Sequence, residues 1–421
     1  MPASNSLSKP PRAPGLRADA TLIGLVGLAH GISHFSQLLL APLFPWLKDA
    51  FGVGYQELGF VLTVFFVVSC AVQAMSGFVV DRFSPRPVLY AGLAMLAGGA
   101  FLYASAQSYW MLLAGAVVGG IGNGVFHPVD YTLFNRRVAP TRLGHAYSVH
   151  GITGSLGWAL APAFVVPLAV AFSWRVALLS AGVLALAVLA VLVWQGGHLV
   201  LTRQEVQKAT GQGANAPSAA VAGGLDFLRI PAVWMCFAFF FFYAAATSAV
   251  QAFAPEAARQ LHDVPVAMAA VCLTIYMVCS AGGMVLGGFM AADPQRCERI
   301  VGAGFAVGAC MALAMAYLQM PAVMVPVLFG LMGFATGTAG PSRDLLVKRS
   351  TPENATGRVY GVVYAGLDIG QAVAPLVFGL LMDRGQLRGV LVGLAVVQGV
   401  LIASAFNVRR ARRTALVARL T

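Results

Sequence analysis

Few residues of this 421-residue chain carry a charge. Asp, Glu, Lys and Arg make up 10% of it, while 59% of the residues are hydrophobic. Soluble domains carry about 25% charged residues. Apolar runs of about 20 residues, the length that crosses a bilayer as a helix, recur along the whole chain. The composition excludes an ordinary soluble protein and predicts an all-α polytopic membrane protein that contacts the lipid bilayer.

Acidic residues are scarcer than basic ones. The chain has 15 Asp and Glu against 27 Lys and Arg, a formal net charge of +12. A nucleic-acid partner is one explanation of such an excess, but the basic residues lie in short loops at alternate ends of the apolar runs. With the N-terminus inside the cell, 21 of them are cytoplasmic, five are outside and Arg343 lies within a span. This asymmetry follows the positive-inside rule, so we expect an inner-membrane protein with both termini cytoplasmic and no nucleic-acid partner.

The chain also lacks the motifs of ATP-driven pumps and of metal-dependent membrane enzymes. No nucleotide-binding P-loop is present, which argues against an ATP-driven pump. His30 and His34 form a single pair, whereas iron-dependent membrane enzymes need several histidine boxes. The six cysteines have no metal-ligand spacing, and the first apolar run is too long for a cleavable signal peptide. We therefore expect no enzyme activity and no cofactor, with a proton gradient as the energy source.

The chain does contain an internal repeat. Residues 128–162 align without a gap with residues 341–375, at an offset of 213 residues. The matched residues include Pro128 with Pro341, Arg136 with Arg349, Gly144 with Gly357, Tyr147 with Tyr360, Gly157 with Gly370, and Pro162 with Pro375. A match at half the chain length predicts two copies of one unit. Repeated halves of this kind are typical of membrane carriers.

The apolar runs predict twelve transmembrane helices, six in each copy. They are expected at residues 21–47, 56–80, 87–106, 109–134, 144–171, 174–196, 231–254, 266–291, 299–318, 321–346, 357–382 and 387–407. The resulting domains are a cytoplasmic N-terminal tail (1–20), an N-terminal six-helix bundle (21–199), a cytoplasmic linker (200–228), a C-terminal six-helix bundle (229–407) and a basic cytoplasmic tail (408–421).

The loop after the second predicted helix carries a recognisable motif. Residues 77–89 read GFVVDRFSPRPVL, with Gly77, then Asp81-Arg82, then Arg86. This resembles the signature loop of the major facilitator superfamily. The resemblance implies two pseudo-symmetric six-helix bundles that rock around a central site. It also implies that Gly77, Asp81, Arg82 and Arg86 form a cytoplasmic gate; the alternative is that Asp81 and Arg82 only fix topology.

A second resemblance is to the fosmidomycin-resistance-like efflux branch of that family. It rests on His30, on the LFPWLKD sequence at residues 43–49, and on Phe126-His127-Pro128. The chain departs from the pattern at Asp130, which lies one residue later than the expected acid, and at His34, where an acid is expected. The resemblance implies export of a small polar compound.

Ionisable residues inside a membrane span are costly, so each needs a reason. In the first copy they gather on the first, fourth and fifth predicted helices, and the second copy has no histidine in a span. Imidazoles can carry a coupled proton, hydrogen-bond a substrate or bind a metal; each can also simply bond a neighbouring carbonyl. The candidate residues of this half are His30, His34, Gln37, His127, Asp130, Tyr131 and His150.

The second copy offers different chemistry. Arg343 and Asp344 occupy the repeat positions of Asp130 and Tyr131. Arg343 can grip a carboxylate or phosphonate or bridge to Asp130 or Asp344 to close the cytoplasmic end. Asp368, with Gln371 on the same helical face, is a candidate proton site; its alternative is a structural hydrogen bond.

These residues predict a monomeric secondary transporter that couples protons to a small, anionic organic substrate or drug, with export favoured. Three alternatives stay open. The histidines His30, His34, His127 and His150, with Asp130, can instead serve divalent-metal transport. Proton-coupled uptake of an organic acid fits the same residues. A transporter-shaped receptor without flux is the third alternative.

Overall fold

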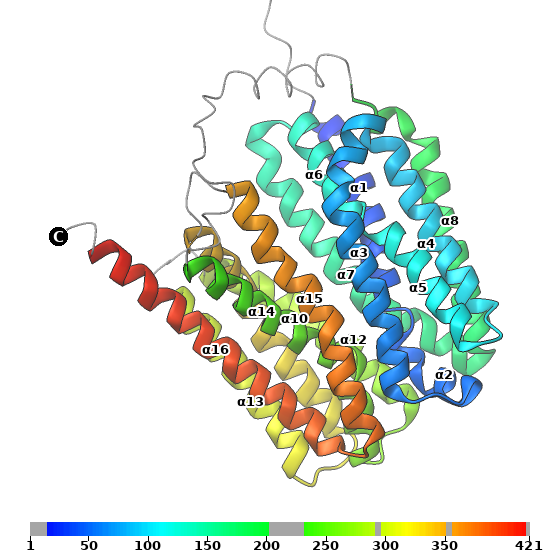
Figure 1. Cartoon of the computed structure of the whole chain (residues 1–421), viewed down its shortest axis with the longest axis vertical. Coiled ribbons are helices and arrows are strands. Elements are labelled where there is room, and N and C mark those ends of the chain that lie inside the picture. Colours follow the sequence, from blue (N-terminus) through cyan, green and yellow to red (C-terminus); the bar gives the residue numbers. More distant parts are fainter. Residues whose placement is uncertain (1–14, 202–230, 291–295, 351–355, 418–421) are drawn as a thin grey trace, which may run out of the picture.

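The computed structural model describes residues 15–201, 231–290, 296–350 and 356–417. The described residues form helices and short connections, with no strand among them. Twelve helical segments are long and apolar enough to cross a membrane (Figure 1). The predicted twelve-helix, all-α fold is confirmed. The predicted linker at 200–228 lies almost wholly outside the described residues.

The N-terminal half holds the first six spans. Its helices are α1 (Leu16–Gln37), η1 (Ala41–Leu43), α2 (Phe44–Phe51), α3 (Tyr55–Phe83), α4 (Pro85–Ala104), α5 (Tyr109–Asn123), α6 (Phe126–Arg137), η2 (Pro140–Arg142), α7 (Leu143–Ala171), α8 (Trp174–Trp194) and η3 (Gly196–Leu199).

The C-terminal half holds the other six spans. Its helices are α10 (Pro231–Ala252), α11 (Ala254–Leu261), α12 (Val266–Met290), α13 (Cys297–Tyr317), α14 (Met324–Ser350), α15 (Thr356–Asp383) and α16 (Leu387–Val417). Helix α16 continues past 407, so the residues predicted as a basic tail begin as helix.

Two spans predicted as continuous helices are interrupted. The first passes from α1 through η1 into α2, where Pro42 and Pro45 occupy first-turn positions of the two new helices. The fourth breaks between α5 and α6 at Gly124. A Cβ at Gly124 would lie 2.5 Å from the carbonyl oxygen of Ser69, so only glycine lets α3 pass this close. The break starts a new helix that carries His127 and Asp130.

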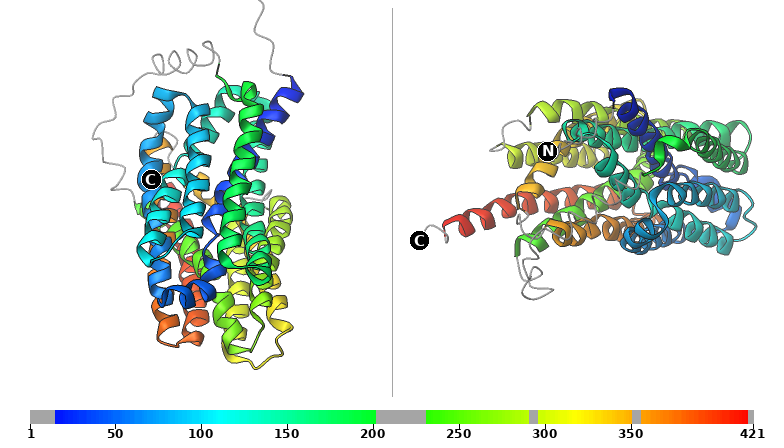
Figure 2. Two further views of the ribbon diagram at one scale, coloured as in Figure 1. Left: turned by 90° about the vertical axis from the view of Figure 1, so that its right-hand side faces the viewer. Right: turned by 90° about the horizontal axis from the view of Figure 1, so that it is seen from above.

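The buried apolar residues form three clusters. One is shared by both halves and contains Leu58 and Phe65 of α3 together with Phe253 and Phe378 of the C-terminal half. The second belongs to the N-terminal half alone and the third to the C-terminal half alone. Both separate clusters lie toward the end of the molecule where residues 201 and 231 flank the linker, here called the linker end. Toward that end, α16 leans away from the N-terminal half (Figures 1 and 2).

At the opposite end the halves are joined by α3 and α15. The backbone N–H groups of Tyr55 and Gln56, at the start of α3, donate to the carboxylate of Asp383 at 2.7 and 2.8 Å. A carboxylate at a helix N-terminus also interacts favourably with the helix dipole. A Cβ at Gly59 would lie 2.6 Å from the carbonyl oxygen of Pro375, so glycine allows the two helices to touch.

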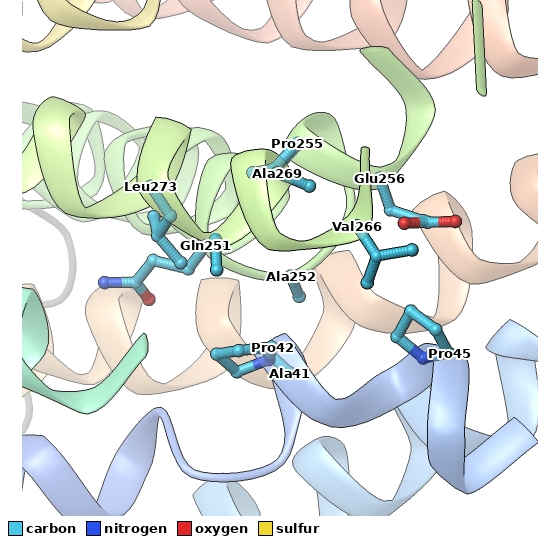
Figure 3. A pocket seen from close by; sticks show the side chains of 11 residues that line it. Ala41, Pro42, Pro45, Gln251, Ala252, Pro255, Glu256, Val266, Ala269 and Leu273 are labelled. Carbon is cyan, nitrogen blue, oxygen red and sulfur yellow. The ribbon is translucent and has the colours of Figure 1, made fainter. Parts of the chain in front are cut away.

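A second contact at this end joins the start of α3 to α11, and a pocket beside it separates η1 and α2 from α10, α11 and α12. Tyr55 Oη donates to Glu256 Oε1 at 3.1 Å, and Arg259 Nε donates to Glu256 Oε2 at 2.7 Å. Figure 3 shows the small pocket between the two sides, with Pro42 and Pro45 facing the segment that follows Gln251. The two halves are therefore closed against each other at the end opposite the linker.

Candidate functional site

The break in the fourth span and the packing of α1 on α7 bring four histidines together in the N-terminal half. The ring centroids of His30 and His150 lie 3.5 Å apart, and those of His30 and His34 lie 4.4 Å apart. The His127 ring is 5.3 Å from that of His30. Three helices thus deliver these imidazoles to one cluster, which the sequence left open.

Asp130 is the acid of this histidine cluster and is fully buried, with 0% exposure. His150 Nε2 donates to its Oδ2 at 3.0 Å, and His30 Nδ1 lies 3.2 Å from the same oxygen. A buried carboxylate is tolerated when it is paired. The placement of Asp130 one residue later than expected from the resemblance therefore aims it at the two imidazoles.

Glycines on α7 make room for the cluster. A Cβ at Gly154 would lie 2.9 Å from His34 Cε1 and 3.1 Å from His30 Nε2, and a Cβ at Gly157 would collide with the carbonyl oxygen of Gly31. The glycines therefore permit α1 and α7 to approach closely enough for the imidazoles to stack.

Gln37 lies beside the cluster within a neutral hydrogen-bond network. Its Nε2 donates to Asn123 Oδ1 at 3.1 Å, and its Oε1 accepts from Trp158 Nε1 at 3.0 Å. Asn123 also accepts from Ser33 Oγ at 2.7 Å. Asn123, Trp158 and Ser33 were not predicted; a polar residue on the same face of α1 as His30 is the signal that would have found Ser33.

Tyr131 borders the histidine cluster. Its ring centroid is 5.3 Å from that of His150 and 6.0 Å from that of His127. The side chain is 41% exposed, so it lies at the rim.

Gln73 of α3 connects this half to the other and was missed by the sequence analysis. His127 Nδ1 donates to Gln73 Oε1 at 3.0 Å, and Gln73 Nε2 donates to Asp368 Oδ2 of α15 at 3.4 Å. Cys70, one turn earlier on α3, also interacts with the carboxylate of Asp368. Asp368 therefore has a hydrogen bond, and that bond crosses between the halves. Gln371 lies three residues further along α15 and is half-buried.

Arg343 of α14 packs against α10. The guanidinium carbon lies 4.2 Å from the ring centroid of Tyr243 and 5.9 Å from that of Phe240, within the range of cation–π contacts. The side chain of Asp344 lies outside the described residues. The side chain of Asp81 and the surroundings of Gly77 are not described either, so the predicted gate stays a prediction. Of its other two residues, Arg82 is exposed and Arg86 is half-buried at the linker end.

A small pocket, here called the central pocket, lies between the halves. Ser155 and Trp158 of α7 line it from one side. From the C-terminal half its polar lining is Tyr243, Thr247, Tyr276, Ser280, Thr336 and Gln398. The Oε1 of Gln398 is buried and has no hydrogen-bond partner among the described residues. The pocket thus presents neutral polar groups within an apolar wall, and Tyr243 connects it to Arg343.

Two sets of three side chains have geometry compatible with a metal ion among the described residues. One is His30, Asp130 and His150, and the other is His30, His34 and His127; the candidate ligand atoms of each lie within 4.8 Å of one another. The arrangement can therefore hold a proton, a hydrogen-bonding ligand or an ion.

Comparison with known proteins gives one matching family model. The model described as Major Facilitator Superfamily matches residues 26–331 and 300–419. The resemblance inferred from residues 77–89 is confirmed by this match.

Three curated relatives are similar over part of the chain. The fosmidomycin resistance protein of Escherichia coli K12 is 27% identical over 146 residues, covering 35% of this chain and 36% of that protein. The probable sulfoacetate transporter SauU of Cupriavidus necator is 26% identical over 166 residues, covering 39% and 38%. The multidrug resistance protein B homolog of Mycobacterium tuberculosis is 27% identical over 162 residues, covering 38% and 30%. These matches span about a third of the length of each relative.

Two solved structures share the fold over nearly the whole chain. Both are of a bacterial homologue of the human lysosomal transporter Spinster in an inward-facing conformation. The occupied form has a TM-score of 0.76 at 14% identity and the unoccupied form 0.73 at 15%; each covers 94% of this chain and 98% of the other. At this identity the likeness establishes the fold alone.

Proposed function

We propose that this chain, which belongs to the major facilitator superfamily, is a secondary transporter that couples protons to the movement of a small anionic organic compound across the bacterial inner membrane. The observation that carries the proposal is the hydrogen bond from Gln73 to Asp368. It joins an ionisable group of the C-terminal half to α3 of the N-terminal half.

The division of the core supports alternating access. One apolar cluster spans both halves at the end opposite the linker, and two separate clusters occupy the linker end. Two rigid halves that share a core at one end only can rock about the site between them. With the linker in the cytoplasm, as the basic loops predict, the end at which the two halves are closed against each other faces the outside.

The environment of Asp368 supports proton coupling. The ionised carboxylate accepts the Gln73 hydrogen bond, and a protonated carboxyl can donate elsewhere, so the protonation state changes what holds α15 to α3. The groups that face Asp368 from α3 are Gln73 and Cys70, with His127 beyond Gln73. Uptake of a proton in one conformation and its release in the other couple the proton gradient to transport.

Arg343 supports an anionic substrate. It lies one turn of α14 after Gly340, which lines the central pocket, and it stacks against Tyr243, which also lines it. A guanidinium can bind a carboxylate, sulfonate or phosphonate through two parallel hydrogen bonds. Sulfoacetate, named for one relative, is a small organic anion.

Export is the proposed direction, because two relatives are named for drug resistance. Uptake of an organic acid is the competing direction. Both are tested by the same assay, in which the purified protein is reconstituted into liposomes and movement of a labelled anion is followed under an imposed pH gradient of either sign.

The substrate class is found first by thermal stability. A ligand that binds the folded state raises Tm by mass action. Small carboxylates, sulfonates and phosphonates are screened at about pH 6 and about pH 8, on either side of the ordinary pKa of histidine. Stabilisation by one anion class that Arg343→Gln removes supports the proposal; stabilisation by neutral or cationic compounds alone contradicts it.

A further inference from the structure

The histidine cluster contains buried polar atoms without a hydrogen bond. Among the described residues, His30 Nδ1, both ring nitrogens of His34, and Asp130 Oδ1 are buried without a hydrogen bond of standard geometry. The side chains of His30 and Asp130 are 2% and 0% exposed. Buried polar groups are nearly always satisfied, and exceptions point to an ion, a water or a functional role. Three ring nitrogens and one carboxylate oxygen of this kind in a single cluster indicate a ligand.

We propose that this cluster binds one divalent transition-metal ion of the zinc, cobalt and nickel class. The ligands are His30 Nδ1, Asp130 Oδ2 and His150 Nε2, three side chains whose ligand atoms all lie within 4.8 Å of one another. Imidazole and carboxylate are the donors these ions prefer. The set combines two neutral donors with one negative charge, which offsets part of the charge of the ion inside the membrane.

The distances fit an ion with small side-chain rotations. Zinc–ligand bonds of about 2.0–2.1 Å at the tetrahedral angle place two ligand atoms about 3.3 Å apart. His150 Nε2 lies 3.0 Å from Asp130 Oδ2, and His30 Nδ1 lies 3.2 Å from it. Two of the three distances among the ligand atoms are therefore already at the required spacing, and the third is within 4.8 Å.

A second set of three side chains provides a route by which an ion can reach this site. His34 and His127 are less buried than His30 and Asp130, and with His30 they form the other set whose ligand atoms lie within 4.8 Å. The hydrogen bond from His127 Nδ1 to Gln73 orients that ring, as partners outside the ligand set do in metal sites. An ion can pass from the outer set to the inner one through the shared ligand His30.

Every ligand belongs to α1, α6 or α7 of the N-terminal half. Ion binding therefore requires no contact between the halves, and it is separable from the proposed transport. Asp368→Asn, which removes the proposed proton site, is expected to leave ion binding unchanged, because Asp368 reaches the cluster only through Gln73.

The test is direct binding of Zn²⁺ and Co²⁺ to the purified full chain in detergent, carrying an affinity tag without histidine. Calorimetry is expected to give one Zn²⁺ per chain, and Co²⁺ is expected to give the visible absorption of a tetrahedral site. Asp130→Asn and His150→Gln should each lower the affinity by at least about tenfold. The matched control is His145→Ala, an exposed histidine on the same helix as His150, which should change nothing.

Three results would overturn the proposal. The first is no saturable binding of either ion to the wild-type chain. The second is binding that Asp130→Asn and His150→Gln leave intact. The third is equal loss in His145→Ala, which would mark surface binding. If the ligand variants are poorly folded, the thermal stability of the wild-type chain decides: a Zn²⁺-dependent rise in Tm supports the proposal, and an unchanged Tm contradicts it.

Discussion

At one equivalent helix contact, the N-terminal half carries an acidic residue and the C-terminal half carries a basic one. In the N-terminal half, α1 meets α6 where His30 lies 3.2 Å from Asp130. In the C-terminal half, α10 meets α14 where the Tyr243 ring lies 4.2 Å from the guanidinium of Arg343. Tyr243 follows His30, and Arg343 follows Asp130, by the same 213 residues. The repeat preserves the contact between the helices. Its residues are an acid and an imidazole in the N-terminal half, and an arginine and aromatic rings in the C-terminal half.

A second position separates the halves in the same way. Gly154 leaves space for His34 and His30, whereas its counterpart is Leu367; Ser155 lines the central pocket, whereas its counterpart is Asp368. Two copies of one fold thus carry different groups at equivalent positions. We interpret the N-terminal half as the ion-binding side and the C-terminal half as the side that holds the substrate anion and the proton.

The largest expected effect comes from removing the proton site of the C-terminal half. Asp368→Asn keeps the shape and the contact with Gln73 but cannot ionise, so pH-driven transport should fall to the level of empty liposomes. Counterflow of the same anion without a pH gradient should persist and serves as the control for folding. Full pH-driven transport by the variant would remove Asp368 from the account.

Replacing one residue of the N-terminal half by its counterpart in the C-terminal half should disrupt the histidine cluster. Gly154→Leu places a side chain where His34 and His30 lie, so we expect a loss of about 1–3 kcal/mol in stability from overpacking, measured as a lower Tm. Gly151→Ala is the matched control on α7, because a Cβ there meets nothing within 4 Å. Equal melting temperatures for Gly154→Leu and the wild type would show that the glycine is not needed for the packing of α1 on α7.

The anion grip is the next difference to test. Arg343→Gln removes hydrogen bonds from a charged group, so the affinity for the stabilising anion should fall about 10- to 100-fold, while Arg343→Lys should retain part of it. The affinity is measured by calorimetry on each variant. An unchanged affinity in Arg343→Gln would assign Arg343 to helix packing alone.

The smallest expected effect concerns the closed end. Asp383→Ala removes the carboxylate that caps α3, which is worth about 1 kcal/mol, so the closed population should fall roughly fivefold relative to the open one. Distances between spin labels on α2 and α11 would report the shift. Asp49→Ala, at an exposed acid of α2, is the control; an equal shift there would rule out a specific role for Asp383.

Much of the fold could be read from the sequence. The apolar runs gave the number of spans, and the ungapped repeat placed Arg343 opposite Asp130. The break at Gly124 could not be predicted, because it depends on how closely α3 passes. The convergence of His30, His127 and His150 was likewise open, since it follows from the packing of α1 on α7.

The residues that the sequence analysis did not predict were missed for a common physical reason. Gln73, Asn123 and Trp158 are neutral, so they carry no large cost in a span and attract no attention in a sequence. Asp383 lies at the end of a span, where charged residues are ordinary. Their roles come from partners in distant helices, which only the three-dimensional arrangement supplies.

The most direct test of the proposed coupling is the proton flux itself. Proteoliposomes are loaded with a pH-sensitive dye, and the anion found by thermal stability is added without an imposed pH gradient. The account predicts that the anion moves protons across the membrane in the wild-type chain and none in Asp368→Asn. Movement of labelled anion in the wild type without any pH change would contradict proton coupling.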